Sequence, residues 1–118
     1  MMAVRITTKN LHSLPSTVQT LLERLGERIR LSRKRRDMTQ TALAEAMFVT
    51  RQTVARLERG DPSVALSTFL LAVFCLQRER ELDNLLAPET DELGMLLEMQ
   101  RQDRRRTVRQ KKRDDLDF

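Results

Sequence analysis

The chain has 118 residues, and its 22 lysines and arginines against 17 aspartates and glutamates give a formal net charge of +5. This length allows one small domain and a further segment, because a module of five short helices takes about 60–70 residues. A single cysteine excludes an intrachain disulfide and a cysteine-rich metal site, and four phenylalanines without tyrosine or tryptophan leave an aliphatic core, which favours helices.

Residues 1–15 are predicted to form a flexible N-terminal arm, and a helix is expected from Ser16 to about residue 36. Ser16 and Gln19 fit the S/T-x-x-E/Q capping box, which satisfies amide donors at a helix start. Gly26 is expected to weaken this helix without breaking it. Apolar residues recur three and four positions apart and predict one buried stripe: Val18, Leu21, Leu22, Leu25 and Ile29.

Residues 39–60 predict two short helices joined by a tight turn. The first carries Leu43 and Met47, four positions apart, and the second carries Val54 and Leu57, three positions apart. Each helix therefore has one narrow apolar face and a polar face turned outward. This is the outline of a helix-turn-helix, a fold that places its second helix in the major groove of DNA.

Threonines are expected to cap both helices of this motif and to direct polar side chains toward DNA. Thr39 caps the first helix, so that the following glutamine can hold a phosphate oxygen. Thr50 caps the second, whose exposed first residues reach base edges, where Arg recognises guanine and Gln recognises adenine. A solvated polar face is the alternative. The candidate DNA-binding residues are Gln40, Thr50, Arg51, Gln52, Thr53 and Arg56.

This segment resembles the lambda-repressor/Cro-like (XRE) helix-turn-helix family, whose usual pattern is close to RxxxxxLTQxxLAxxxGVSxxTISRxERG. The resemblance covers about residues 18–88 and implies a five-helix domain. It also implies a phosphate-clamping glutamine, a base-reading set and an ion pair between Arg33 and Glu58 that ties the first helix to the recognition helix. The matching positions are Arg33, Met38, Thr39, Gln40, Leu43, Ala44, Val49, Thr50, Thr53, Val54, Arg56, Leu57, Glu58, Arg59 and Gly60.

Three positions depart from the family pattern. Phe48 replaces the turn glycine, and a bulky residue at positive φ costs about 1–2 kcal/mol. Either the turn differs here or packing of the phenyl ring offsets the strain. Ala42 stands where a capping glutamate is usual, and Ala65 occupies a common N-cap position before the next helix.

A fourth helix and a short fifth helix are expected after a loop that follows Gly60. The fourth is apolar nearly all round, which is more apolar surface than a small domain can bury alone. We therefore expect a homodimer, whose two recognition helices would lie about 34 Å apart on a palindromic operator. In the fourth helix, Leu66, Phe69, Leu70 and Val73 follow helical spacing and are joined by Phe74, Cys75 and Leu76; the fifth helix carries Leu82, Leu85 and Leu86.

Pro88 is expected to end the domain, and residues 89–118 form a tail of different character. Thr90 can cap a helix there, and eight basic residues against Asp103 follow in residues 101–113. Solvated disorder is one interpretation of this tail. A second is additional phosphate contacts, and a third is partner binding through the terminal Leu116 and Phe118. The arrangement resembles HipB-type antitoxins, which pair with HipA-type kinase toxins.

The sequence thus predicts an all-α, five-helix lambda-repressor-like domain at residues 16–88 and a helical or disordered basic tail. No catalytic constellation, metal cluster or phosphate-binding glycine loop is visible, so we expect no enzyme activity, cofactor or metal. Without a membrane span or signal peptide, the expected location is the cytoplasm. The predicted function is an autoregulating repressor and antitoxin. The alternatives are a stand-alone XRE-family regulator and a protein-interaction adaptor.

Overall fold

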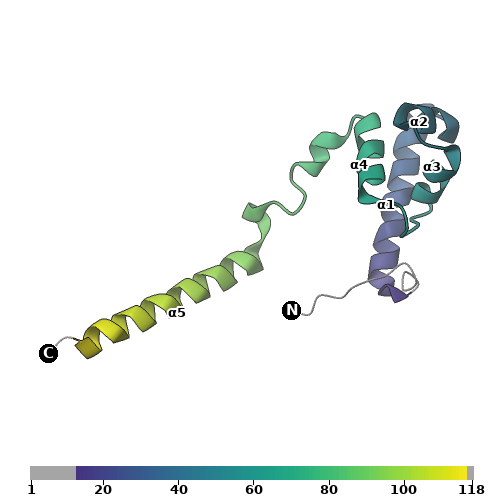
Figure 1. The fold of residues 1–118 in the computed structure, drawn as a ribbon. Coiled ribbons are helices and arrows are strands. Elements are labelled where there is room, and N and C mark those ends of the chain that lie inside the picture. Colours follow the sequence, from purple (N-terminus) through teal and green to yellow (C-terminus); the bar gives the residue numbers. More distant parts are fainter. Residues whose placement is uncertain (1–12, 117–118) are drawn as a thin grey trace. The chain divides into compact units, whose positions relative to one another are not determined.

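The computed structural model describes residues 13–116, so residues 1–12 of the predicted N-terminal arm lie outside the described range. Every regular element among the described residues is helical (Figure 1). The all-α class with a C-terminal helix is therefore confirmed. The chain divides into two compact units, one ending at Leu82 and one beginning at Asp83. The α-helices are α1 Ser16–Arg35, α2 Gln40–Met47, α3 Arg51–Glu58, α4 Leu66–Cys75 and α5 Glu92–Leu116, with 3₁₀ helices at Glu79–Leu82 and Pro88–Thr90.

The core of the first unit lies among α1, α2, α3 and α4. The four apolar residues predicted for the two helices of the motif are all buried, as the spacing indicated. Burial of a side chain such as Leu or Val contributes about 1.5–3 kcal/mol, so these contacts fix α3 against its neighbours. The buried apolar residues are Ile29, Leu43, Ala44, Met47, Val54, Leu57, Ala72, Val73 and Leu76. The buried stripe predicted for α1 is only partly correct: Ile29 is buried and Leu22 half-buried, whereas Val18, Leu21 and Leu25 are exposed.

The start of α1 differs from the predicted capping box. Pro15 is the N-cap residue, and its carbonyl oxygen accepts hydrogen bonds from the amides of Val18, at 2.9 Å, and Gln19, at 3.1 Å. The Gln19 Nε2 instead donates to the carbonyl oxygen of Leu14 at 2.9 Å. The predicted capping box is wrong because Ser16 is already the first helical residue. The carbonyl oxygen of Pro15 therefore accepts the amide hydrogen bonds for which the Ser16 hydroxyl was predicted.

The turn between α2 and α3 keeps the left-handed geometry that usually requires glycine. Phe48 has φ 57° and ψ 40°, and the residue is 96% exposed. Packing therefore does not offset the strain, and the bulky residue carries the left-handed cost of about 1–2 kcal/mol. The turn is closed by backbone bonds, with the Phe48 amide donating to Glu45 at 3.2 Å and the Val49 amide donating to Ala44 at 3.0 Å.

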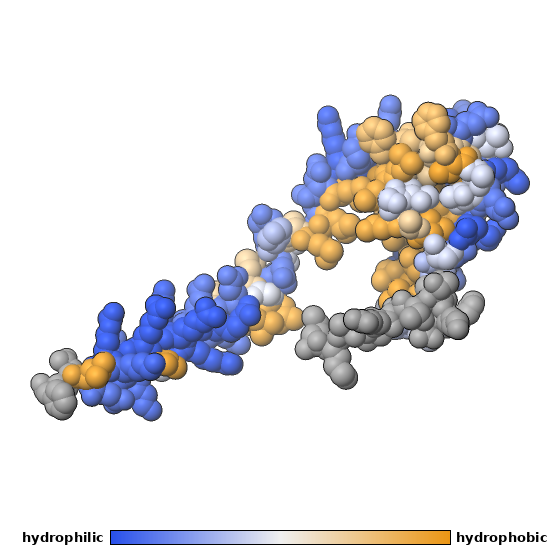
Figure 2. All heavy atoms as spheres, viewed as in Figure 1, coloured by the Kyte–Doolittle hydropathy of each residue, from blue (hydrophilic) through white to orange (hydrophobic). Residues whose placement is uncertain are grey.

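Helix α4 leaves part of its apolar surface exposed, as its composition predicted. Val73 is buried and Phe69 half-buried, whereas Leu66 and Leu70 are exposed. Figure 2 shows hydrophobic residues exposed on the first unit, where α4 lies. The fifth helix expected around Leu82, Leu85 and Leu86 is shorter than predicted, because the 3₁₀ helix Glu79–Leu82 ends at Leu82, which packs on the core. Leu85 and Leu86 lie beyond this helix and are exposed.

The second unit is dominated by the 25-residue helix α5, which has no buried residue. The amide of Gly94 donates to Asp91 Oδ1 at 2.9 Å, so Asp91 caps the helix. Thr90, predicted as the cap, instead donates its hydroxyl to the Ala87 carbonyl at 2.8 Å. The helix continues through the basic segment and ends at Leu116, so the segment is helical in the structure and not disordered, which was the alternative interpretation. None of the helices among the described residues combines the length and apolar character that a membrane span needs.

Gly26 has a role that the sequence did not indicate, since α1 meets the backbone of α3 there. A Cβ at this position would lie 2.5 Å from the carbonyl oxygen of Glu58 and 2.7 Å from that of Leu57. Backbone atoms cannot turn aside as a side chain can. The absence of a side chain at Gly26 thus permits the close approach of the two helices.

Gly26→Ala should therefore destabilise the first unit. Alanine gains about 1 kcal/mol of helix propensity, but overpacking costs about 1–3 kcal/mol, and we expect a net loss measured by urea unfolding. Gly94→Ala is the control, because this glycine belongs to the second unit and the atoms nearest to a Cβ there are those of the Asp91 side chain, not backbone. A Gly26→Ala protein as stable as the wild type would contradict the close approach.

Candidate DNA-binding site

The N-terminus of α3 is fixed by its capping threonine, as predicted. Thr50 Oγ1 accepts a hydrogen bond from the amide of Thr53 at 3.2 Å, and the two hydroxyl groups lie 3.0 Å apart within hydrogen-bond distance. The first helix of the motif begins in the same way, with the Ala42 amide donating to Thr39 Oγ1 at 3.0 Å. Thr50 and Thr53 are thus hydrogen-bonded to each other at the N-terminal end of α3, the end expected to face DNA.

The outer face of α3 presents three polar side chains to solvent. Arg51 and Gln52 are exposed in its first turn. Arg59, at the C-cap position, is exposed as well and was not among the predicted contacts. It follows Gln52 by seven residues, or about two helical turns, and therefore lies on the same side. That spacing could have identified it.

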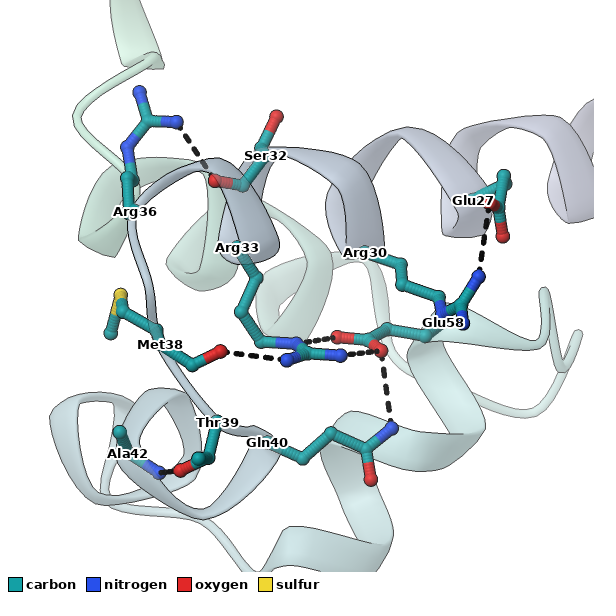
Figure 3. Close-up of polar contacts among 10 residues, drawn as sticks. All are labelled: Glu27, Arg30, Ser32, Arg33, Arg36, Met38, Thr39, Gln40, Ala42 and Glu58. Carbon is teal, nitrogen blue, oxygen red and sulfur yellow. Dashed lines mark hydrogen bonds and ion pairs between the residues drawn. The ribbon is translucent and has the colours of Figure 1, made fainter.

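A buried ion pair holds the inner face of α3. Arg33 Nε donates to Glu58 Oε2 at 2.7 Å and Arg33 Nη2 donates to Glu58 Oε1 at 3.0 Å, while Nη1 donates to the carbonyl oxygen of Met38 at 2.7 Å (Figure 3). The two side chains are only 8% and 3% exposed. The hydrogen bonds that Arg33 donates to Glu58 raise the pKa of Arg33, against the opposing effect of burial. The pair implied by the family resemblance is present.

Gln40 is joined to this pair. Its Nε2 donates to Glu58 Oε1 at 3.1 Å, as Figure 3 shows. Gln40 and Arg51 also line one open hollow of about 540 Å³, together with Ala55 and Arg59 of the same surface. The structure thus brings the predicted phosphate contact and one predicted base contact to a common surface.

Arg56 has a different environment from the other predicted contacts. Its Nε donates to Asp61 Oδ2 at 3.1 Å, and its Nη2 donates to Ser63 Oγ. Ser63 donates to Asp61 Oδ1 through both its amide, at 2.9 Å, and its hydroxyl, at 2.7 Å. The guanidinium of Arg56 is therefore bound to the loop that follows α3.

The same loop lowers the pKa of Asp61 to about 2 from an ordinary value near 3.8. The hydroxyl of Ser63 is the largest cause, followed by its amide and then by the guanidinium of Arg56. All three favour the charged carboxylate. The loop is thus held by a charged aspartate at neutral pH.

Glu58→Ala should strongly destabilise the first unit, because it leaves the Arg33 charge buried without its partner. Breaking a buried pair in this way costs about 3–5 kcal/mol, measurable by urea unfolding. The control is Glu27→Ala, which removes the exposed pair with Arg30 and should cost at most about 1 kcal/mol. Similar small losses in both variants would contradict a structural role for the Arg33–Glu58 pair.

Ser63→Ala should raise the pKa of Asp61 toward its ordinary value, as followed by the carboxyl carbon shift in an NMR titration. Because the folded pKa is depressed, the charged carboxylate stabilises the fold above pH 3.8, and this contribution disappears as the pH falls toward about 2. The variant should lose part of that acid dependence. Arg56→Gln should raise the pKa less. No change in Ser63→Ala would overturn the assignment.

One family model, described as a helix-turn-helix domain, matches residues 24–83, just over half of the chain. The match contains α2, α3, the turn between them and both partners of the buried ion pair. No curated protein matches the chain. The chain belongs to the helix-turn-helix domain family.

Proposed function

We propose that the protein is a sequence-specific transcriptional repressor of the XRE type, which inserts the N-terminal end of α3 into the major groove of an operator. The observation that carries this proposal is the two-sided character of α3. Arg51 and Gln52 are exposed in its first turn, while Val54, Leu57 and Glu58 are buried on its other side. A helix anchored in this way presents a fixed pattern of donors to base edges, as direct readout requires.

Each of these polar side chains has a chemical role in the proposed complex. Arg51 can donate two hydrogen bonds to guanine, and Gln52 can donate to and accept from adenine. Gln40 gives one amide proton to Glu58, and its second amide proton is available for a phosphate oxygen. The methyl groups of Thr50 and Thr53 provide apolar contacts for thymine.

Arg56 contributes less than Arg51 in this proposal. Its contact with a base requires release of the bonds to Asp61 and Ser63. The cost of that release reduces the net gain from any new contact. Arg59, exposed on the same side as Gln52, is available for a phosphate without such a cost.

We further propose that the protein acts as a homodimer on a palindromic operator in the cytoplasm. The exposed apolar side chains of α4 support this, since Leu66 is 72% and Phe74 61% exposed. Leu70, four positions from each of them on the same side of α4, is exposed as well, and a row of exposed apolar residues favours burial against a second copy. Two-fold symmetry would then place both recognition helices about 34 Å apart, one helical turn of DNA.

The proposed biological role is that of the antitoxin in a HipBA-like operon, which represses its own genes and binds a kinase-like toxin. The tail supports it through the exposed Leu116, beside the acidic residues Asp114 and Asp115. Phe118, the other predicted anchor, lies outside the described residues. A stand-alone regulator is the second candidate, because the proposed base contacts all belong to the first unit. An adaptor role would leave the exposed Arg51 and Gln52 without a purpose.

The double substitution Arg51→Ala and Gln52→Ala should abolish operator preference and leave weak nonspecific binding. Each good base contact contributes about 1–3 kcal/mol of discrimination, whereas phosphate contacts do not depend on sequence. Duplexes selected from a random library would be compared by gel shift with random-sequence duplex. Arg80→Ala, which removes one exposed charge from the 3₁₀ helix Glu79–Leu82, is the control. Unchanged preference in the double variant would refute the assignment of α3.

Deletion of residues 114–118 should weaken binding of the toxin encoded beside this gene and leave DNA affinity nearly intact. The deletion removes the proposed apolar anchors and three acidic residues but none of the proposed base contacts. Calorimetry with the toxin and anisotropy with the operator would measure the two affinities. Equal loss of both would contradict the division of roles, and the absence of a kinase-like neighbour gene would favour the stand-alone regulator.

A further inference from the structure

The C-terminal half of α5 concentrates positive charge along an exposed helix. Eight basic residues lie between positions 101 and 113, against the single acidic residue Asp103. All eight side chains are exposed. The ion pairs found in the described part of the chain involve other arginines, at positions 30, 33, 56 and 78. The charge of this segment is therefore not neutralised within it.

Four of these residues share one side of the helix. At 3.6 residues per turn, their directions fall within an arc of about 80°. We call this set the basic stripe: Arg101, Arg105, Arg109 and Lys112. Asp103 and Asp114 lie on the opposite side, about 160–180° from its centre. There Gln110 Nε2 donates to Asp114 Oδ1 at 3.2 Å.

The stripe places like charges where they repel each other. Arg101 and Arg105 are four residues apart, as are Arg105 and Arg109, and like charges at this spacing destabilise a helix. Closely spaced anions along the stripe would relieve the repulsion. The stripe is about 17 Å long, a length over which duplex DNA carries about ten phosphate charges.

We propose that the basic stripe of α5 binds the phosphate backbone of DNA, as a second and sequence-independent contact surface. This inference rests on the proposed DNA-binding function and adds to it a source of affinity outside the helix-turn-helix. The stripe adds no base specificity, because phosphates are the same at every position. It makes binding more sensitive to salt, because each contacted phosphate releases condensed counterions.

An anionic membrane surface is the competing polyanion, and the composition of the helix argues against it. A helix that lies on a membrane needs a broad apolar face opposite its basic face. Residues 101–113 contain one apolar side chain, Val108. Figure 2 shows hydrophilic residues over most of this part of α5. The stripe is therefore suited to binding by charge alone.

The test measures how the binding constant of the full chain for random-sequence duplex DNA depends on salt. In the stripe variant, Arg101, Arg105, Arg109 and Lys112 are changed to glutamine. If all four contact phosphates, the slope of log K against log salt should fall by about 3 to 4 units. The matched control changes the other four basic residues of the segment to glutamine: Arg104, Arg106, Lys111 and Arg113. It removes the same charge and should lower the slope by about 1 unit or less.

Circular dichroism checks that both variants keep the helix, which glutamine favours. Equal decreases of the salt slope in both variants would show that only the net charge of the segment matters, and would overturn the inference that the basic stripe is the contact surface. An unchanged slope in the stripe variant, with operator preference intact, would overturn the inference and leave the proposed function standing. If the slope falls as expected but the wild-type protein shows no operator preference, the stripe inference stands and the proposed sequence-specific function is overturned. Stripe-dependent binding to phosphatidylglycerol vesicles with an unchanged DNA slope would assign the stripe to membranes instead.

Discussion

The buried pair of Arg33 and Glu58 is the interaction on which the orientation of α3 depends. Two charges removed from water are tolerated only when their hydrogen-bonding groups are satisfied. Here all three guanidinium nitrogens and both carboxylate oxygens are engaged, and Gln40 adds a bond to the same carboxylate. Gly26 allows α1 to reach the backbone of α3 at Glu58. One residue of α3 thus receives constraints from two other helices.

These constraints separate the parts of α3 that hold the fold from those available to DNA. Val54, Leu57 and Glu58 face inward, so Arg51 and Gln52 can vary without loss of the core. Arg56 belongs to neither set, because its guanidinium donates hydrogen bonds to Asp61 and Ser63 in the loop after α3. In the proposed function, α3 supplies discrimination between sequences, and the basic stripe of α5 supplies affinity that does not depend on sequence.

Local patterns in the sequence predicted what depends on local chemistry. Apolar spacing identified the buried Leu43 and Val54, and the threonine caps followed from hydroxyl chemistry at helix starts. The Arg33–Glu58 pair came from the family resemblance, because residues 25 positions apart carry no local signal. The bonds of Arg56 depend on the path of a loop, and the role of Gly26 depends on a distance between helices. Neither could be predicted from the sequence. The length of α5 could not be predicted either, because a run of like charges is also typical of a disordered tail.

In the proposed complex, the N-terminal end of α3 contacts DNA while its other side stays packed against α1. An NMR titration with a duplex selected for binding tests this most directly, through backbone amides and the side-chain signals of Arg51, Gln52 and Arg33. We expect large shifts at residues 50–53 and at Gln40, with the Arg33 Nε signal retained. Shifts concentrated on α4, or loss of the Arg33 signal on binding, would contradict it.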